Sequence, residues 1–214
     1  MNALLDWVRT HPDILARTAS EHLILSAVSL AIAVAVAVPL GIALSRRAQA
    51  AGPAVALVNT LRTIPSLALL VVMLPVLGTG MTPSIVALVL YGLPTILVNT
   101  MAGLSGIDRD VVEAARGQGL SRRQILGSIE LPLASPTIVA GIRNAAVQIV
   151  SAATLAVFIG GGGFGELISA GMGLLDIPQL VTGAIAVAVL AAGTELAFAA
   201  AERMLARRIG EGSA

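Results

Sequence analysis

The longest uncharged stretch of the chain runs from Thr63 to Ile107. A helix of about 20 apolar residues already crosses the roughly 30 Å hydrocarbon core of a bilayer, so this stretch is too long for one span. The run Gly78–Gly80 predicts a break, after which Thr82 caps a new helix and Pro83 lies in its first turn. Hydrophobic residues make up 57% of the chain and charged residues 12%, about half the charged share of a soluble domain. We therefore expect an all-α integral membrane protein.

Hydropathy and break signals together predict five membrane-spanning helices in one domain, residues 23–208. Leu23–Ser45 carries no charge and predicts the first span. Ser135 and Pro136 predict a cap and a first-turn proline for the fourth span, which the glycine run Gly160–Gly163 ends in a flexible outer turn. The expected spans are residues 23–45, 53–77, 83–104, 136–158 and 177–200.

The distribution of arginine predicts the orientation in the membrane. The expected outer loops, residues 78–83 and 160–176, contain no arginine, so the positive-inside rule places the N-terminus outside and the C-terminus in the cytoplasm. We expect residues 1–22 to be an outer segment, either an amphipathic helix with Trp7 near lipid or a frayed tail, and residues 209–214 to be a cytoplasmic tail. The nine arginines then inside are Arg46, Arg47, Arg109, Arg116, Arg122, Arg123, Arg203, Arg207 and Arg208.

Missing residue types exclude several classes of function. The chain has no cysteine and no lysine, which removes thiol nucleophiles, Cys-ligated metals, Schiff-base chemistry and the lysine of a phosphate-binding loop. Its only histidines, His11 and His22, lie near the N-terminus, so a His-based metal or catalytic site is not expected. The 13 basic residues nearly balance the 12 acidic ones, which gives no attraction to nucleic acid. We expect neither an enzyme nor a cofactor or metal site.

The only long polar stretch, residues 108–132, predicts two short helices joined by a glycine elbow. Asp108 and Asp110 suit the N-terminus of the first helix, which Gly117 and Gly119 end. Ser121 and the glutamine three residues later form a capping box that begins the second helix. Leu131 and Pro132 are expected to end that helix before the fourth span begins.

The spacing of this loop resembles the EAA loop of ABC-importer permease subunits. In that family the loop forms a coupling helix that docks on a cytoplasmic ATPase, and the resemblance extends to a fold like that of the methionine permease MetI. It implies an inner-membrane location, an extracytoplasmic binding protein, a second permease subunit, and ATP and Mg²⁺ bound on the partner ATPase only. The motif positions are Glu113, Ala114, Ala115, Gly119, Ile129, Leu131 and Pro132; with Gly117 and Leu120 of the elbow they form the expected ATPase-coupling surface.

A second resemblance concerns the cargo. The segment from Asn59 to Leu70, the tripeptide Gly141-Ile142-Arg143 and the run from Ile159 to Gly165 are similar to permeases for glycine betaine, carnitine, choline and related osmoprotectants. The chain departs from the family's pattern at Gly161, Phe164 and Val98. Permeases for methionine and other amino acids share the span number and the EAA loop, so an amino-acid importer is the alternative.

Aromatic residues bear on how such a cargo is recognised. A quaternary ammonium group is usually held by an aromatic cage, yet this chain has one Trp, one Tyr and three Phe. We expect the binding protein to provide most of the recognition and this subunit to provide a weakly selective path.

Polar side chains inside the expected spans are candidates for that path, because such groups normally face a bundle interior or water. The candidates are Asn59, Thr63, Ser66, Tyr91, Asn99, Asn144, Gln148 and Thr154. For the amide side chains the alternative is hydrogen bonding between helices. We expect Arg62 and Arg143 to snorkel to the cytoplasmic interface or to pair with Glu113 or Glu130, with a contact to the cargo as the alternative. We expect Glu195 to have a structural partner, with a proton-relay role as the alternative.

Two other function classes fit the sequence less well. A secondary transporter usually shows an inverted repeat and charged residues near the midplane, and no repeat relates the two halves of this chain. A membrane-embedded enzyme using carboxylates alone needs a pair of them within a span, and Glu195 has no such companion. Pro65 and Pro75 are expected to kink the second span, a feature that suits a moving helix but also occurs in static bundles.

Overall fold

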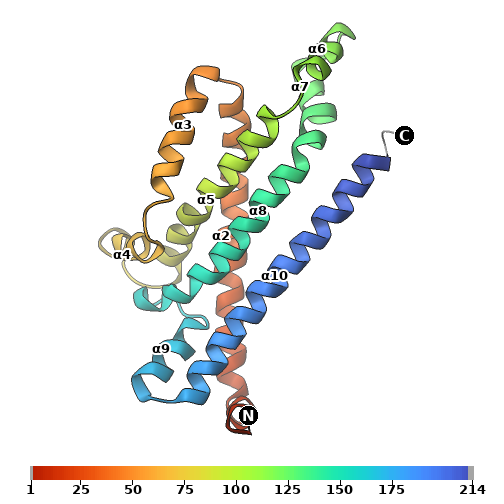
Figure 1. Ribbon diagram of the computed structural model, residues 1–214. Helices are drawn as coiled ribbons and strands as arrows, with labels where there is room; N and C mark the ends of the chain where they lie inside the picture. The colour runs from red at the N-terminus through yellow and green to blue at the C-terminus, as the bar shows by residue number, and fades with distance from the viewer. Residues whose placement is uncertain (1, 212–214) are drawn as a thin grey trace.

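A computed structural model describes residues 2–211, and in that range the regular structure is entirely helical (Figure 1). Helix α1 and the last turns of α10 lie at opposite ends of an elongated bundle, with α6 and α7 at the same end as the last turns of α10. The helices are α1 (Asn2–Thr10), α2 (Pro12–Ser45), α3 (Ala48–Leu61), α4 (Ser66–Leu77), α5 (Met81–Ser105), α6 (Arg109–Gly117), α7 (Arg122–Ile125), a π-helical turn (Leu126–Glu130), α8 (Leu131–Ala153), a 3-10 helix (Thr154–Ile159), α9 (Gly165–Leu174) and α10 (Ile177–Glu211).

Three long helices, α2, α5 and α8, form the centre of the bundle, and α10 packs along α8. One core cluster includes Leu25, Leu88 and Ile149, and a second includes Ala33 and Ile96. Small residues at the crossings let these helices approach closely, which is how apolar helices gain packing energy in a membrane.

The crossing of α5 and α8 depends on Gly141. A Cβ atom at Gly141 would lie 2.4 Å from the Cβ atom of Asn99, and neither backbone can move without disturbing the core. We expect Gly141→Ala to lower the free energy of unfolding by about 1–3 kcal/mol, as overpacked cores do. Thermal unfolding of the purified protein in detergent measures it. Gly193→Ala on α10 is the matched control, because nothing lies within 4 Å of its added Cβ. Equal unfolding midpoints for the two variants would contradict the conclusion that the crossing of α5 and α8 requires glycine at position 141.

The all-helical membrane fold is confirmed, but one of the five expected spans is not a single helix. In the described residues four helices are long and apolar enough to cross a membrane: Pro12–Ser45, Met81–Ser105, the continuous run Arg122–Ile159, and Ile177–Met204. The fifth crossing exists only if α3 and α4 form one span that is bent by 89°.

The kink expected at Pro65 within residues 53–77 is a complete break between α3 and α4, which meet at an angle of 89°. The chain leaves the helix after Leu61 and resumes it at Ser66, with Pro65 in an extended conformation (φ −59°, ψ 137°). Pro65 has no N–H to continue the ladder, and its ring disfavours the helical conformation of Ile64. Pro75, in contrast, is accommodated inside α4.

Residues 1–22 include a short amphipathic helix, α1, but the second half of this segment belongs to α2. Helix α2 begins at Pro12 and runs without interruption through the expected boundary at residue 22. Trp7 on α1 is buried, with 7% of its surface exposed, and packs with Phe164 and Leu167 rather than lying near lipid. At the other terminus α10 reaches Glu211, and residues 212–214 of the expected tail lie outside the described residues.

The expected helix end at Pro132 is also wrong, as is the cap at Ser135. One helical run joins α7, the π-helical turn and α8, and Pro136 lies inside it. The Ser135 hydroxyl donates back to the carbonyl of Pro132, at 2.7 Å. A π-helical turn is wider than an α-helical one, so its position immediately before Leu131 and Pro132 relieves the clash that a proline ring makes with the preceding turn.

Candidate coupling surface and translocation path

The loop between α5 and α8 has the predicted helix–elbow–helix form. The Asp108 carboxylate caps α6 by accepting from the N–H of Asp110 at 2.9 Å, and Ser121 and Gln124 form the complete capping box of α7. Gly119 adopts a φ of +82°, and its N–H donates to the carbonyl of Arg116 at 2.9 Å. The left-handed conformation at Gly119 is what turns α6 back onto α7.

Burial divides the expected coupling residues into an internal and an external set. Ala115 is 4% exposed and Ile125 of α7 is 3% exposed, so these two side chains are buried beneath the loop. Leu120, Ile129 and Leu131 are half-buried. The exposed members are Glu113, Ala114, Gly117, Gly119 and Pro132, which leaves them free for a partner at the end of the molecule where α6 and α7 lie (Figure 1).

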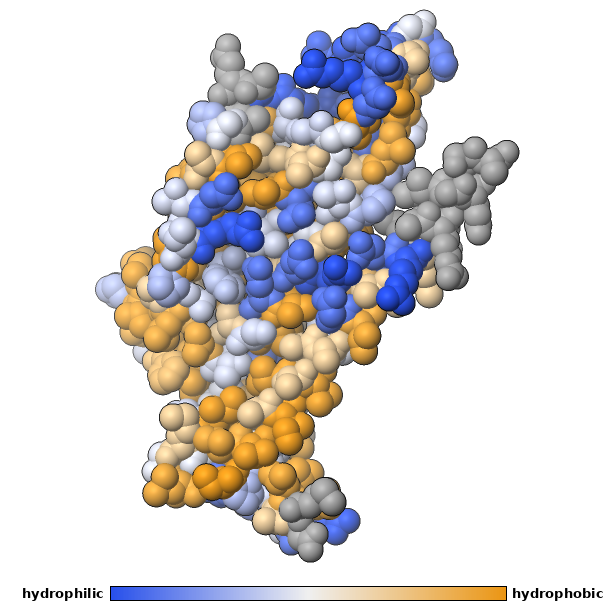
Figure 2. Space-filling view, in the orientation of Figure 1, coloured by the Kyte–Doolittle hydropathy of each residue, from blue (hydrophilic) through white to orange (hydrophobic). Residues whose placement is uncertain are grey.

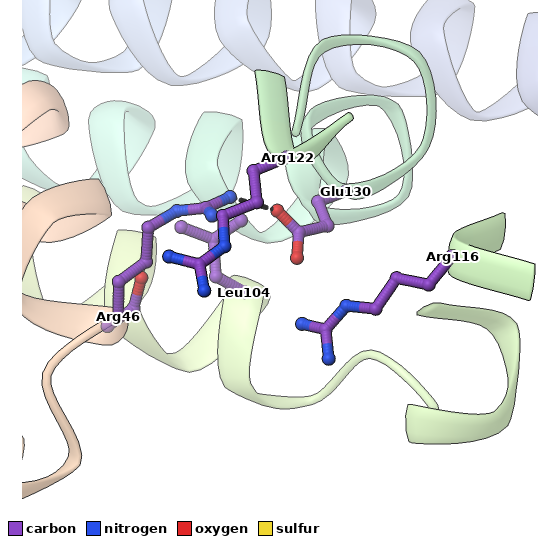
Figure 3. A pocket seen from close by; sticks show the side chains of 6 residues that line it. Arg46, Leu104, Arg116, Arg122 and Glu130 are labelled. Atoms are coloured by element: carbon purple, nitrogen blue, oxygen red, sulfur yellow. Dashed lines mark hydrogen bonds and ion pairs between the residues drawn. The ribbon is translucent and has the colours of Figure 1, made fainter. Parts of the chain in front are cut away.

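A polar pocket of about 340 Å³ lies beneath this loop (Figure 3). Arg46, at the end of α2, pairs with Glu130 in the π-helical turn, and the side chains of Arg116 and Arg122 extend into the same pocket. Three guanidinium groups around one carboxylate make the pocket positively charged. The ion pair ties the end of α2 to the start of the fourth span, so Glu130 is the partner of Arg46 and not of Arg62 or Arg143.

Two of the candidate path residues make hydrogen bonds inside the bundle. The Thr95 hydroxyl of α5 donates to the amide oxygen of Gln148 on α8 at 3.0 Å, and the Asn99 amide donates to the carbonyl of Thr95 at 2.8 Å. Tyr91 is half-buried against the core cluster of Leu88 and Ile149. The bond between Thr95 and Gln148 joins α5 to α8, whereas the bond of Asn99 lies within α5.

The other path candidates lie at the surface or at the breaks in the helices. Asn144 is exposed on α8, with Ser151 exposed seven residues further along the same face. Asn59 and Thr63 are exposed at the end of α3 and Ser66 is half-buried where α4 begins. The Thr154 hydroxyl is buried without a hydrogen-bond partner at the start of the 3-10 helix, among the side chains that the structure describes.

The surface therefore has two kinds of face. The exposed side of α2 is an apolar stripe that suits lipid, made of Leu23, Ile24, Val28, Ile32, Val36 and Leu40. Figure 2 shows the face formed by α3, α5 and α8, where hydrophilic side chains cover the middle of the molecule above a hydrophobic lower part. A polar band at this depth is unfavourable against hydrocarbon and indicates a face that contacts water or another subunit.

Arg143 on α8 pairs with two glutamates of α10. Its Nη1 atom lies 2.7 Å from Glu202 Oε2 and its Nε atom lies 3.5 Å from Glu195 Oε1. The expectation that Arg143 snorkels or pairs with a loop acid is therefore wrong, and the structural partner expected for Glu195 is Arg143. Sequence spacing gives no signal for this network, because the partners lie on separate helices.

The outer glycine run is held in place rather than flexible. Glu21 accepts the N–H of Gly163 at 2.9 Å, and His22 Nδ1 accepts the N–H of Phe164 at 3.3 Å. Gly162 and Gly163 have φ values of +80° and +84°, and a Cβ atom at Gly162 would lie 2.6 Å from a Glu21 carboxylate oxygen. Sequence reasoning missed Glu21 and His22 because their contacts are 142 residues away.

The comparison with known families decides the class of protein. Residues 23–211 match the family described as "Binding-protein-dependent transport system inner membrane component". The chain belongs to this family. It is thus a permease subunit of a transport system, and the family implies a multi-pass location in the inner membrane, with an ATPase, a substrate-binding protein and a second permease subunit as partners.

Curated relatives of this permease are named for osmoprotectants. The choline transport system permease protein OpuBB of Bacillus subtilis (strain 168) is 38% identical over 205 residues, covering 96% of this chain and 94% of that one. The glycine betaine/carnitine/choline transport system permease protein OpuCB of the same strain is 38% identical over 203 residues, covering 95% and 94%. The osmoprotectant import permease protein OsmY of Salmonella typhimurium is 42% identical over 172 residues, covering 79% and 73%.

Among solved structures, the permease resembles a chain of the MetNI methionine ABC transporter in its inward-facing conformations. The TM-score is 0.77 at 26% sequence identity, and the match covers 90% of this chain and 96% of that one. The expected fold, like that of the methionine permease, is confirmed.

Proposed function

We propose that this permease subunit translocates a quaternary-amine osmoprotectant of the glycine betaine, carnitine or choline type, driven by a partner ATPase. The observation that carries the cargo assignment is the 38% identity to choline and glycine betaine/carnitine/choline permeases over nearly the whole chain. A methionine-type cargo has weaker support, since the match to the methionine transporter is at 26% identity.

The coupling loop supplies a mechanism in this proposal. The exposed part of α6 and the elbow docks on the ATPase, which binds ATP and Mg²⁺. Because α7, the π-helical turn and α8 form one continuous helical run from Arg122 to Ile159, a displacement of the docked loop is carried directly into the fourth span. The Arg46–Glu130 pair transmits the same displacement to α2. ATP binding and hydrolysis then shift the population between two facings of the path.

The polar face provides the other half of the mechanism. We place it against a second permease subunit, so that Asn59, Thr63, Ser66 and Asn144 border a central path and the apolar side of α2 faces lipid. The N-terminus lies outside and the coupling loop in the cytoplasm, as the arginine distribution requires.

Reconstituted uptake tests the proposal. The permease is placed in liposomes with the ATPase and binding protein of its own system, and radiolabelled glycine betaine is followed with and without ATP on the ATPase side. We expect ATP-dependent uptake that choline or carnitine competes with and methionine does not. ATP-dependent uptake of methionine alone would replace the cargo assignment, and uptake without the ATPase would favour a secondary transporter.

A further inference from the structure

Arg62 lies deep in the membrane, at the break between α3 and α4. Helix α3 begins at Ala48, at the cytoplasmic end of the proposed orientation, and Arg62 is its C-terminal cap. Fourteen residues at about 1.5 Å each place Arg62 about 21 Å along the helix, in a hydrocarbon core roughly 30 Å thick. Figure 1 shows this junction at the edge of the bundle, near the middle of its length. In the proposed orientation that depth is too great for the side chain to snorkel to the cytoplasmic interface.

Arg62 also differs from the other arginine inside the spans in having no acidic partner. Arg143 is paired with Glu195 and Glu202, whereas Arg62 is exposed and makes no ion pair with any side chain that the structure describes. The remaining described acidic groups are paired at the two ends of the bundle or lie in the polar loops there. No carboxylate of this chain is thus available to Arg62 at its own depth.

The surroundings of Arg62 are polar. Asn59, Thr60 and Thr63 are exposed on either side of it at the end of α3. An unpaired guanidinium and three polar side chains cannot face lipid tails at this depth without a large cost. The end of α3 therefore faces water or another subunit, and in the arrangement proposed above it borders the path of the cargo.

We propose that the Arg62 guanidinium binds the carboxylate of a zwitterionic cargo as it crosses the path, an inference that rests on the proposed function above. A guanidinium matches a carboxylate through two parallel hydrogen bonds. Glycine betaine and carnitine carry a carboxylate, and choline does not. Among the described aromatic side chains Trp7 and Phe164 are buried, Tyr91 and Phe198 are half-buried, and Phe158 alone is exposed, so these residues offer no aromatic cage for the ammonium group. Recognition is then divided: the binding protein holds the cationic end of the cargo, and Arg62 holds the anionic end.

The test compares two cargoes in the same reconstituted transporter. Initial rates of ATP-driven uptake of glycine betaine and of choline are measured for the wild type, Arg62→Gln and Arg62→Lys. We expect Arg62→Gln to lower glycine betaine uptake about tenfold, the size of one lost charge-assisted hydrogen bond, while choline uptake stays the same or rises. Arg62→Lys keeps the charge but loses the paired hydrogen bonds, so its glycine betaine uptake should lie between those of the wild type and Arg62→Gln. Arg47→Gln, at the other end of α3, is the matched control and should alter neither rate.

Three results would overturn the proposal. Equal loss of both cargoes in Arg62→Gln would show that Arg62 pairs with another subunit or supports the fold. Equal loss of glycine betaine uptake in Arg62→Lys and Arg62→Gln would show that the positive charge at position 62 does not bind the cargo. This comparison uses glycine betaine alone, so it holds even if the binding protein does not deliver choline. Unchanged uptake in Arg62→Gln would remove Arg62 from the path. In all three cases a transporting wild type leaves the proposed function intact, whereas a wild type that takes up neither cargo would overturn both.

Discussion

Replacing Gly119 with proline is expected to reduce ATP-driven uptake to background while the protein still inserts in the membrane. Gly119 has a φ of +82° and donates its N–H to the carbonyl of Arg116. Proline fixes φ near −65° and has no N–H, so the elbow loses both its turn and its hydrogen bond. Helix α6 then no longer packs on α7, and the docked surface is no longer rigidly joined to the fourth span. Uptake and ATP hydrolysis are measured on the same proteoliposomes.

Two neighbouring substitutions control for general damage to the loop. Gly127→Ala, outside the expected coupling residues, adds a Cβ atom with nothing within 4 Å and requires no left-handed φ, so it should transport like the wild type. Gly119→Ala meets no neighbour but retains the left-handed conformation at a cost of about 1–2 kcal/mol, so it should show an intermediate rate. Normal uptake by Gly119→Pro would show that the elbow does not couple the ATPase to the path.

The elbow was predictable from sequence because its determinants are local. Asp108 caps a helix two residues away, Ser121 and Gln124 are three residues apart, and Gly119 alone allows the required φ. The apolar lengths of α2, α5 and α10 are likewise a property of each segment by itself. Local patterns of this kind predict the folded structure wherever packing against the rest of the chain does not override the backbone preference of the segment.

The failures have non-local causes. Pro132 predicts a helix end, but packing of the fourth span preserves the helix, and a π-helical turn absorbs the proline. Proline signals are ambiguous in the same way at Pro65 and Pro75, since one breaks its helix and the other does not. Contacts such as that of His22 with Phe164, and of Arg143 with Glu202, join segments far apart in the chain, so no spacing rule reveals them.

The difference between Arg62 and Arg143 shows what the structure adds to a list of polar residues. Both arginines interrupt apolar segments, and sequence alone assigns them the same behaviour. The structure gives Arg143 two acidic partners on α10 and leaves Arg62 without one on an exposed polar face. Arg143 is therefore expected to contribute to the stability of the fold and Arg62 to the transport of the cargo. Unfolding measurements detect the first effect and uptake measurements the second.

Replacing Arg143 with leucine is expected to destabilise the permease by about 3 kcal/mol, the cost of leaving partly buried charges without their partner. The substitution keeps much of the aliphatic stem but removes the guanidinium that pairs with Glu202 and Glu195. Two carboxylates then remain between α8 and α10 without a counter-charge, and α10 loses its polar attachment to the bundle. Unfolding of the purified protein by increasing fractions of dodecyl sulfate measures the change.

Neutralising the two glutamates as well separates charge from packing. The triple variant Arg143→Leu, Glu195→Gln, Glu202→Gln leaves no unpaired charge, so it should recover most of the stability that the single variant loses. Glu202→Gln alone should cost more than Glu195→Gln alone, because Glu202 lies 2.7 Å from the guanidinium and Glu195 lies 3.5 Å from it and is nearly half exposed. A triple variant as unstable as Arg143→Leu would show that the arginine stem, rather than its charge, holds α10 against α8.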